Sequence, residues 1–255
     1  MNNDGGVRMN EKKLGVLGGM GPMATSVFFD KLIKHTDAEK DQDHIDTIIL
    51  NHATLPDRTE SILEHKKLPF LNAVKKDLEL FETAGVENIA IPCNTSHYFY
   101  NDIQSMTSIH VINMVEVTVK YIAQKYGTNS KIGVLATNGT IESGVYEKAC
   151  QLYNLKSHQP KADIQNRVMG TIYNIKADSH YEAPELETII NGLITEEGCH
   201  AIILGCTELS CVPLSNDLKK YCIDPLELLV HESIVLSGKQ PLNPFHTGSF
   251  FYHEA

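Results

Sequence analysis

Apolar runs of strand length alternate with segments of helical periodicity along the first half of the chain. The runs lie at residues 13–17, 46–51, 86–92 and 109–112. Apolar residues recur at helical spacing from Pro22 onward, over residues 69–84 up to Gly85, and over residues 115–126. The polar segment 54–68 between the second strand and the second helix is predicted to be a loop. Strands alternating with helices favour a mostly parallel sheet covered by helices.

The same pattern restarts in the second half of the chain. Residues 131–139 (KIGVLATNG) align without a gap with residues 13–21 (KLGVLGGMG). Farther on, residues 199–205 lead into Cys206 as residues 86–92 lead into Cys93, at a nearly equal separation. One such pair of strand–helix units carries little information, but two pairs in register indicate an internal duplication.

The predicted fold is therefore α/β, with two similar lobes from an internal duplication. Each lobe is a mostly parallel sheet flanked by helices, and the active site lies in the cleft between them, because ligands bind beyond the carboxyl ends of parallel strands. The predicted boundaries are a ragged tail at 1–12, lobes at 13–113 and 114–224, and a tail at 237–255. A helix at 225–236 is expected to pack back on the first lobe.

Composition and charge narrow the possible partners. The formal net charge is −10 and Lys and Arg are scattered, which argues against a nucleic-acid partner. No apolar run approaches the roughly 18 residues of a membrane span, and the N-terminus lacks the apolar core of a secretory signal. We expect no membrane partner, a cytoplasmic location and six reduced cysteines. An anionic substrate would need a locally positive site.

Two of the cysteines occupy positions suited to chemistry. Cys93 and Cys206 each follow a strand and precede a predicted helix, where backbone N–H groups and the helix dipole favour a thiolate. Inverting a stereocentre by proton transfer requires a base on one face and an acid on the other, which two opposed thiols can supply. A single cysteine is more often a small buried apolar residue, and that interpretation is kept for Cys150, Cys199, Cys211 and Cys222.

Four motifs make the chain resemble the aspartate/glutamate racemase family. They are GGMGP at 18–22, LPDRT at 55–59, PCNTSH at 92–97 and GCTEL at 205–209. The resemblance implies racemisation without pyridoxal phosphate in a cleft between two lobes, with Cys93 and Cys206 as the acid/base pair. It also implies a homodimer.

The resemblance further implies a set of substrate contacts. These are Met20, Arg58, Asn94, Thr95, Thr137, Thr140, Lys176 and Thr207. Among them Arg58 and Lys176 supply positive charge for a second carboxylate, which favours an acidic amino acid. His97, four residues after Cys93, and Glu208, two residues after Cys206, are predicted to lie behind the cysteines.

No cofactor and no metal are expected. The glycine turn at 18–22 lacks the GxGxxG and GxxxxGK[ST] patterns of nucleotide sites, and the histidines lack zinc spacing with cysteine.

Other functions stay open at this stage. Within the same superfamily, a broad-specificity amino-acid racemase, a hydantoin racemase and a maleate isomerase share the paired cysteines. Outside the enzymes, a two-lobed protein that only binds a small anion would have a similar cleft. The paired thiols and the missing export signal count against that last alternative.

Overall fold

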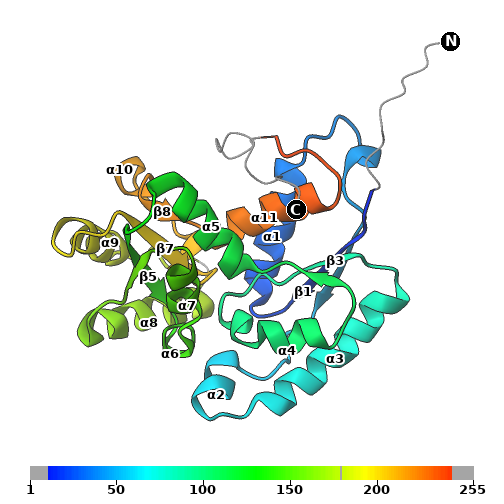
Figure 1. The fold of residues 1–255 in the computed structure, drawn as a ribbon, viewed down its shortest axis with the longest axis horizontal. Coiled ribbons are helices and arrows are strands. Elements are labelled where there is room, and N and C mark those ends of the chain that lie inside the picture. Colours follow the sequence, from blue (N-terminus) through cyan, green and yellow to red (C-terminus); the bar gives the residue numbers. More distant parts are fainter. Residues whose placement is uncertain (1–10, 179, 243–255) are drawn as a thin grey trace.

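The computed structural model describes residues 11–178 and 180–242 and contains two four-stranded sheets (Figure 1). The first sheet has the order β2-β1-β3-β4, and its strands are β1 (Leu14–Gly18), β2 (Thr47–Asn51), β3 (Asn88–Ala90) and β4 (His110–Val111). The second has the order β6-β5-β7-β8, and its strands are β5 (Lys131–Ala136), β6 (Lys156–His158), β7 (Ala201–Gly205) and β8 (Cys222–Ile223). All neighbouring strands are parallel. The predicted α/β fold of two parallel sheets is confirmed.

Helices connect the strands in both halves. Those of the first half are α1 (Pro22–His35), α2 (Arg58–Leu63), α3 (Lys67–Thr83) and α4 (Tyr100–Ser105), with the short 3-10 helices η1 (Asp41–Asp43) and η2 (Thr95–Phe99). Those of the second half are α5 (Met114–Tyr126), α6 (Asn138–Ser143), α7 (Val145–Leu152), α8 (Ala162–Ala177), α9 (Leu186–Thr195), η3 (Leu209–Cys211), α10 (Asn216–Lys219) and α11 (Pro225–Leu236). We call each sheet with its helices a lobe.

The central strands are buried on both faces, as parallel strands between helices must be. On one face of the first sheet, Phe70, Val74 and Phe81 of α3 fill the core. Each such side chain, fully removed from water, contributes about 1.5–3 kcal/mol. Gly15 allows the close approach of α3, because a Cβ there would lie 3.0 Å from the Phe81 ring.

Helix α11 lies against α1 on the other face of the first sheet (Figure 1). Its apolar residues join the core formed by Leu14 and Phe28. The helix begins where the sequence pattern places it, because Pro225 suits its first turn and the Asp224 side chain accepts a hydrogen bond from Leu226 N at 2.9 Å. The lobe boundaries at 13–113 and 114–224 stay a prediction. Most of the predicted tails, residues 1–10 and 243–255, lies outside the described residues.

The structure corrects the predicted loop at 54–68. Residues 58–63 form α2, and α3 begins at Lys67 rather than Pro69. The Asp57 side chain caps α2 by accepting a hydrogen bond from Glu60 N at 2.8 Å. An acid followed three residues later by Glu is a helix-start signal, so this helix was readable from the sequence.

A second correction concerns the segments after the cysteines. After Cys93 the 3-10 helix η2 runs directly into α4, so a helix does follow this cysteine, whereas after Cys206 only the single-turn 3-10 helix η3 follows. Within the described residues, no helix is long and apolar enough to cross a membrane. The same part of the chain holds no group of three or more His, Cys, Asp or Glu side chains suited to a metal ion.

Candidate active site

A small cavity at the carboxyl ends of both sheets brings most of the predicted site residues together. Its lining consists of Met20, Asp57, Arg58, Thr59, Cys93, Asn94, Thr95, Thr137, Lys176, Cys206, Thr207 and Glu208. The free volume is only about 20 Å³, which is room for about one water molecule. Entry of a small-molecule ligand therefore requires the lining side chains or the lobes to move apart.

The strand ends deliver these residues in matching pairs. Cys93 follows β3, and Cys206 follows β7, which takes the same place in the second sheet. Met20 follows β1, and Thr137 follows its counterpart β5. Lys176 comes instead from the last turn of α8. The cavity thus lies at the strand ends, where the alternating pattern places a ligand site.

Cys206 is a buried thiol held by a carboxylate. Its Sγ donates a hydrogen bond to Glu208 Oε2 at 2.8 Å. Burial, and next the negative charge of Glu208, raise the pKa of the Cys206 thiol well above its ordinary value, whereas Lys176 lowers it. Cys206 is therefore protonated near neutral pH. The expectation that its position before a helix favours the thiolate is wrong, because η3 is a single short turn and Glu208 outweighs it.

Cys93 is equally buried, but no carboxylate holds its thiol in the described part of the chain. Its carbonyl accepts a hydrogen bond from His97 Nδ1 at 2.9 Å, and His97 Nε2 accepts one from Met114 N at 3.1 Å. Burial lowers the pKa of His97, so the ring is neutral. His97 consequently fixes the backbone at Cys93 rather than contacting the sulfur.

Asn94, the residue after Cys93, presents an unused amide to the cavity. Its Oδ1 accepts a hydrogen bond from the hydroxyl of Tyr146, which belongs to the second lobe. Its Nδ2 is buried and has no partner within the described residues. This N–H₂ group is available to an acceptor in the cavity.

Three threonine hydroxyls join the two lobes beside Asn94. Thr95 Oγ1 lies 3.1 Å from Thr137 Oγ1 and 2.9 Å from Thr140 Oγ1. Thr137 and Thr140 are 3.1 Å apart. Thr140 does not line the cavity and reaches it only through this triangle. In the closed arrangement the three hydroxyls satisfy one another, and those of Thr95 and Thr137, which line the cavity, can turn toward an anion.

Positive charge comes from one residue of each lobe. Arg58 binds only backbone carbonyls, with Nη1 donating to Pro56 O at 3.1 Å, and it forms no ion pair in the described part of the protein. Lys176 lies over the ring of Tyr173, with its Nζ 5.9 Å from the centroid. Burial lowers the pKa of Lys176, but the negative charge of Glu208 and the neighbouring acidic thiols raise it above its ordinary value. Lys176 is thus charged at neutral pH, and a guanidinium such as that of Arg58 is always charged in proteins.

The sequence interpretation missed three residues and placed one too far away. Asp57 and Thr59 line the cavity on either side of Arg58, within a motif already singled out. No local sequence pattern pointed to Tyr146, because its hydrogen bond to Asn94 joins segments that are far apart in the chain. Glu208 touches the Cys206 sulfur directly instead of lying behind it.

Comparisons with known proteins show which family and which relatives this chain is similar to. The model of the Asp/Glu/Hydantoin racemase family matches residues 17–232. The broad specificity amino-acid racemase RacX of Bacillus subtilis (strain 168) is 34% identical over 207 residues, covering 78% of this chain and 86% of that protein.

Solved structures give the same result. An aspartate racemase from Picrophilus torridus is 32% identical, with a TM-score of 0.78 over 90% of this chain and 96% of that one. A glutamate racemase from Francisella tularensis in complex with D-glutamate has a TM-score of 0.61 at 19% identity, over 89% of this chain and 81% of that one. At that identity the likeness concerns the fold alone.

Proposed function

The chain belongs to the Asp/Glu/hydantoin racemase family, and from that premise we propose that it interconverts the L and D enantiomers of aspartate, of glutamate, or of both. The single observation that supports this most is the composition of the closed cavity. Two thiols from matching strand ends, Cys93 and Cys206, share it with two cations, Arg58 and Lys176.

In this proposal the cysteines act as a thiolate/thiol pair on opposite faces of Cα. Cys206 starts as the proton donor, because its neighbour Glu208 and its burial keep the thiol protonated. Cys93 then serves as the base in that direction. One turnover leaves Cys93 as the thiol and Cys206 as the thiolate, ready for the opposite enantiomer.

Lys176 makes the reverse direction feasible. Its positive charge lowers the pKa of the Cys206 thiol and so favours the thiolate, against burial and the negative charge of Glu208. Since enantiomers have equal free energies, kcat/KM must be the same in both directions. The asymmetry of the two thiols is therefore expected in kcat and KM separately.

The remaining contacts fit an amino acid with two carboxylates. The free Nδ2 of Asn94 and the hydroxyls of Thr95 and Thr137 can donate to the α-carboxylate, which gains negative charge as the proton leaves. Arg58 and Lys176 can hold the distal carboxylate, Arg58 by a two-point fork. This local positive charge overcomes the repulsion expected from a chain of net charge −10.

The experiment that tests the mechanism is exchange of the α-hydrogen of aspartate and glutamate in deuterium oxide, without pyridoxal phosphate and with a chelator. We expect exchange in the native protein and none in the Cys93→Ala/Cys206→Ala double variant. The matched control is Cys150→Ala, another buried thiol outside the cavity, which should keep exchanging. Equal exchange in the double variant would contradict the proposal.

A broader substrate range is the second candidate, and the identity with the broad specificity racemase of Bacillus subtilis favours it. A chiral assay of both enantiomers of aspartate, glutamate and several neutral amino acids separates the two candidates. Conversion of hydantoins or of maleate would point to the other superfamily activities, and binding without exchange would point to an anion-binding protein. We further propose a cytoplasmic homodimer, which light scattering and cell fractionation test.

A further inference from the structure

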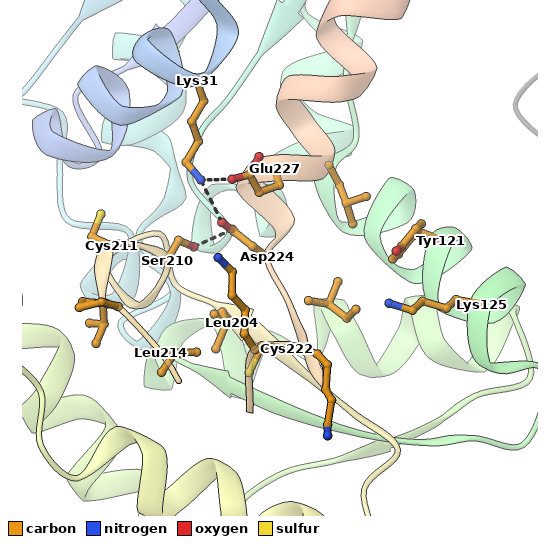
Figure 2. Close-up of a pocket in the computed structure, with 16 residues that line it drawn as sticks. Lys31, Tyr121, Lys125, Leu204, Ser210, Cys211, Leu214, Cys222, Asp224 and Glu227 are labelled. Atoms are coloured by element: carbon orange, nitrogen blue, oxygen red, sulfur yellow. Dashed lines mark hydrogen bonds and ion pairs between the residues drawn. The ribbon is translucent and has the colours of Figure 1, made fainter. Parts of the chain in front are cut away.

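A second and much larger cavity lies between the two lobes on the other side of the segment that carries Cys206 (Figure 2). Its volume is about 520 Å³, within the range of small-molecule sites. Helices α1 and α11 form one wall, and the segment from η3 to β8, with α5, forms the other. We call it the lysine cavity after Lys31, Lys125, Lys219 and Lys220 in its lining.

The charge of the lysine cavity is opposite to that of the whole protein. Lys31 is neutralised by Asp224, at 3.6 Å, and by Glu227. Lys125, Lys219 and Lys220 also line the cavity and take part in no ion pair among residues 11–178 and 180–242. Figure 2 shows Lys125 extending toward the cavity from α5. An acidic chain thus surrounds one pocket with an excess of positive charge, which attracts anions.

Most of the remaining lining is apolar. It includes Leu204 of β7, Leu214 of the loop after η3 and Leu228 of α11, and the half-buried thiol of Cys222 lies beside Leu204 (Figure 2). Inorganic phosphate would leave these surfaces in contact with water. A ligand that uses both features is an anion with an apolar body, such as an aromatic or acyl carboxylate or sulfonate.

One chain segment separates the two cavities. Cys206, Thr207 and Glu208 line the active-site cavity, whereas residues 210–214 line the lysine cavity. Cys211 Sγ donates to Thr207 O at 3.5 Å, and Ser210 Oγ donates to Asp224 Oδ1 at 2.6 Å. Lys31 of the first lobe binds the same Asp224. A ligand that engages Lys31 therefore acts on a hydrogen-bonded path that ends at the residue after Cys206.

We propose that the lysine cavity binds an anionic small molecule with an apolar body, and that its occupancy changes the racemase rate through segment 206–214. The effect on rate rests on the proposed racemase function, whereas the binding does not. The two parts therefore need separate measurements.

Binding is measured by the fluorescence of 8-anilinonaphthalene-1-sulfonate, an aromatic anion. We expect saturable binding of one molecule per chain, and weakening by about tenfold or more in Lys219→Glu/Lys220→Glu. The matched control is Lys75→Glu/Lys76→Glu, two adjacent exposed lysines on α3 that change the net charge equally and line neither cavity. The control should bind as the native protein does.

Three results would overturn the site. They are equal weakening in both double variants, equal binding of the neutral N-phenyl-1-naphthylamine, and displacement of the dye by saturating aspartate or glutamate. Thermal unfolding of each variant verifies that it is folded. Leu214→Trp, which fills the cavity and leaves the lysines in place, should abolish binding as well.

The effect on rate is measured by α-hydrogen exchange with and without saturating dye. We expect a change of about twofold or more in the native protein and none in Lys219→Glu/Lys220→Glu. An unchanged exchange rate in the dye-saturated native protein would refute the control of catalysis. Absence of exchange under all conditions would refute the proposed racemase function instead, while the fluorescence result would still decide the site.

Discussion

The two cysteines occupy matching positions in the two sheets, but different residues surround the two sulfur atoms. Cys93 follows β3 and Cys206 follows β7, in sheets of identical strand order. At Cys206 a carboxylate, Glu208, accepts the thiol hydrogen bond, whereas at Cys93 the nearby His97 binds the backbone carbonyl. The matching strand order therefore accounts for the symmetric placement of the two thiols, whereas Glu208, which follows only one of the two strands, raises the pKa of the Cys206 thiol.

The largest effect is expected from removing one thiol at a time. Cys93→Ser and Cys206→Ser should each lower racemisation by about 10²-fold or more, because each removes the acid or base of one face. Each variant should still exchange the α-hydrogen of one enantiomer, and the two variants should act on opposite enantiomers. Proton NMR of L- and D-aspartate in deuterium oxide measures this. Loss of exchange on the same enantiomer in both variants would break the assignment of one thiol to each face.

A smaller effect is expected from the cations that each lobe contributes. Arg58→Gln or Lys176→Gln should lower kcat/KM for acidic amino acids by about 10-fold to 100-fold, since a hydrogen bond to a charged group is worth about 1.5–3 kcal/mol. The rates with neutral amino acids should change little in Arg58→Gln, whereas Lys176→Gln should also slow them in the direction in which Cys206 is the base, because Lys176 lowers the pKa of that thiol. Arg167→Gln is the control, because Arg167 is paired with Glu185 outside the cavity. Equal losses of kcat/KM for acidic and neutral substrates would show that Arg58 and Lys176 do not bind a second carboxylate.

The hydrogen bond between the lobes at Asn94 should have a more modest effect. Tyr146→Phe removes the donor that orients the Asn94 amide, and we expect kcat/KM to fall about fivefold, as for one neutral hydrogen bond. Combining it with Asn94→Ala should add little further loss, which a double-mutant cycle measures. Tyr153→Phe, at a half-buried tyrosine that donates a hydrogen bond to Glu116 outside the cavity, is the control. Additive losses of kcat/KM would show that Tyr146 does not act through Asn94.

Glu208→Gln is expected to change the maximal rate least. Its main effect should be on the pH dependence of the rate, because Glu208 accepts the hydrogen bond of the Cys206 thiol. Removing the carboxylate lowers the raised pKa of Cys206, because one of the two main causes of the shift disappears. In the direction where Cys206 is the base, kcat should begin to rise at a lower pH than it does in the native protein. In the direction where Cys206 is the acid, kcat should likewise begin to fall at a lower pH than in the native protein. Rate profiles of both directions measure this, with exposed Glu142→Gln as the control.

Local patterns in the sequence were enough for the frame of the molecule. Apolar runs, proline at helix starts and the repeat of residues 13–21 at 131–139 predicted two parallel sheets with Cys93 and Cys206 at matching strand ends. Helix α11 begins and ends where its pattern indicates. These features depend on neighbours within a few residues, which periodicity and capping rules describe.

Helix α2 could have been predicted from Asp57 and Glu60, but the polar composition around Pro56 led to the prediction of a loop.

Contacts between distant segments cannot be predicted from periodicity or capping rules. The Tyr146–Asn94 hydrogen bond and the threonine triangle join residues of different lobes. No spacing within the chain encodes them.

The sequence by itself thus determined the fold class, the repeated order of strands and helices, and the placement of Cys93 and Cys206 at matching strand ends. Only the tertiary structure decided that burial and Glu208 raise the pKa of Cys206 and that a positively charged second cavity adjoins its loop. The reason is physical: burial and the charges facing a group set its protonation, and both arise only when segments distant in the chain are packed together.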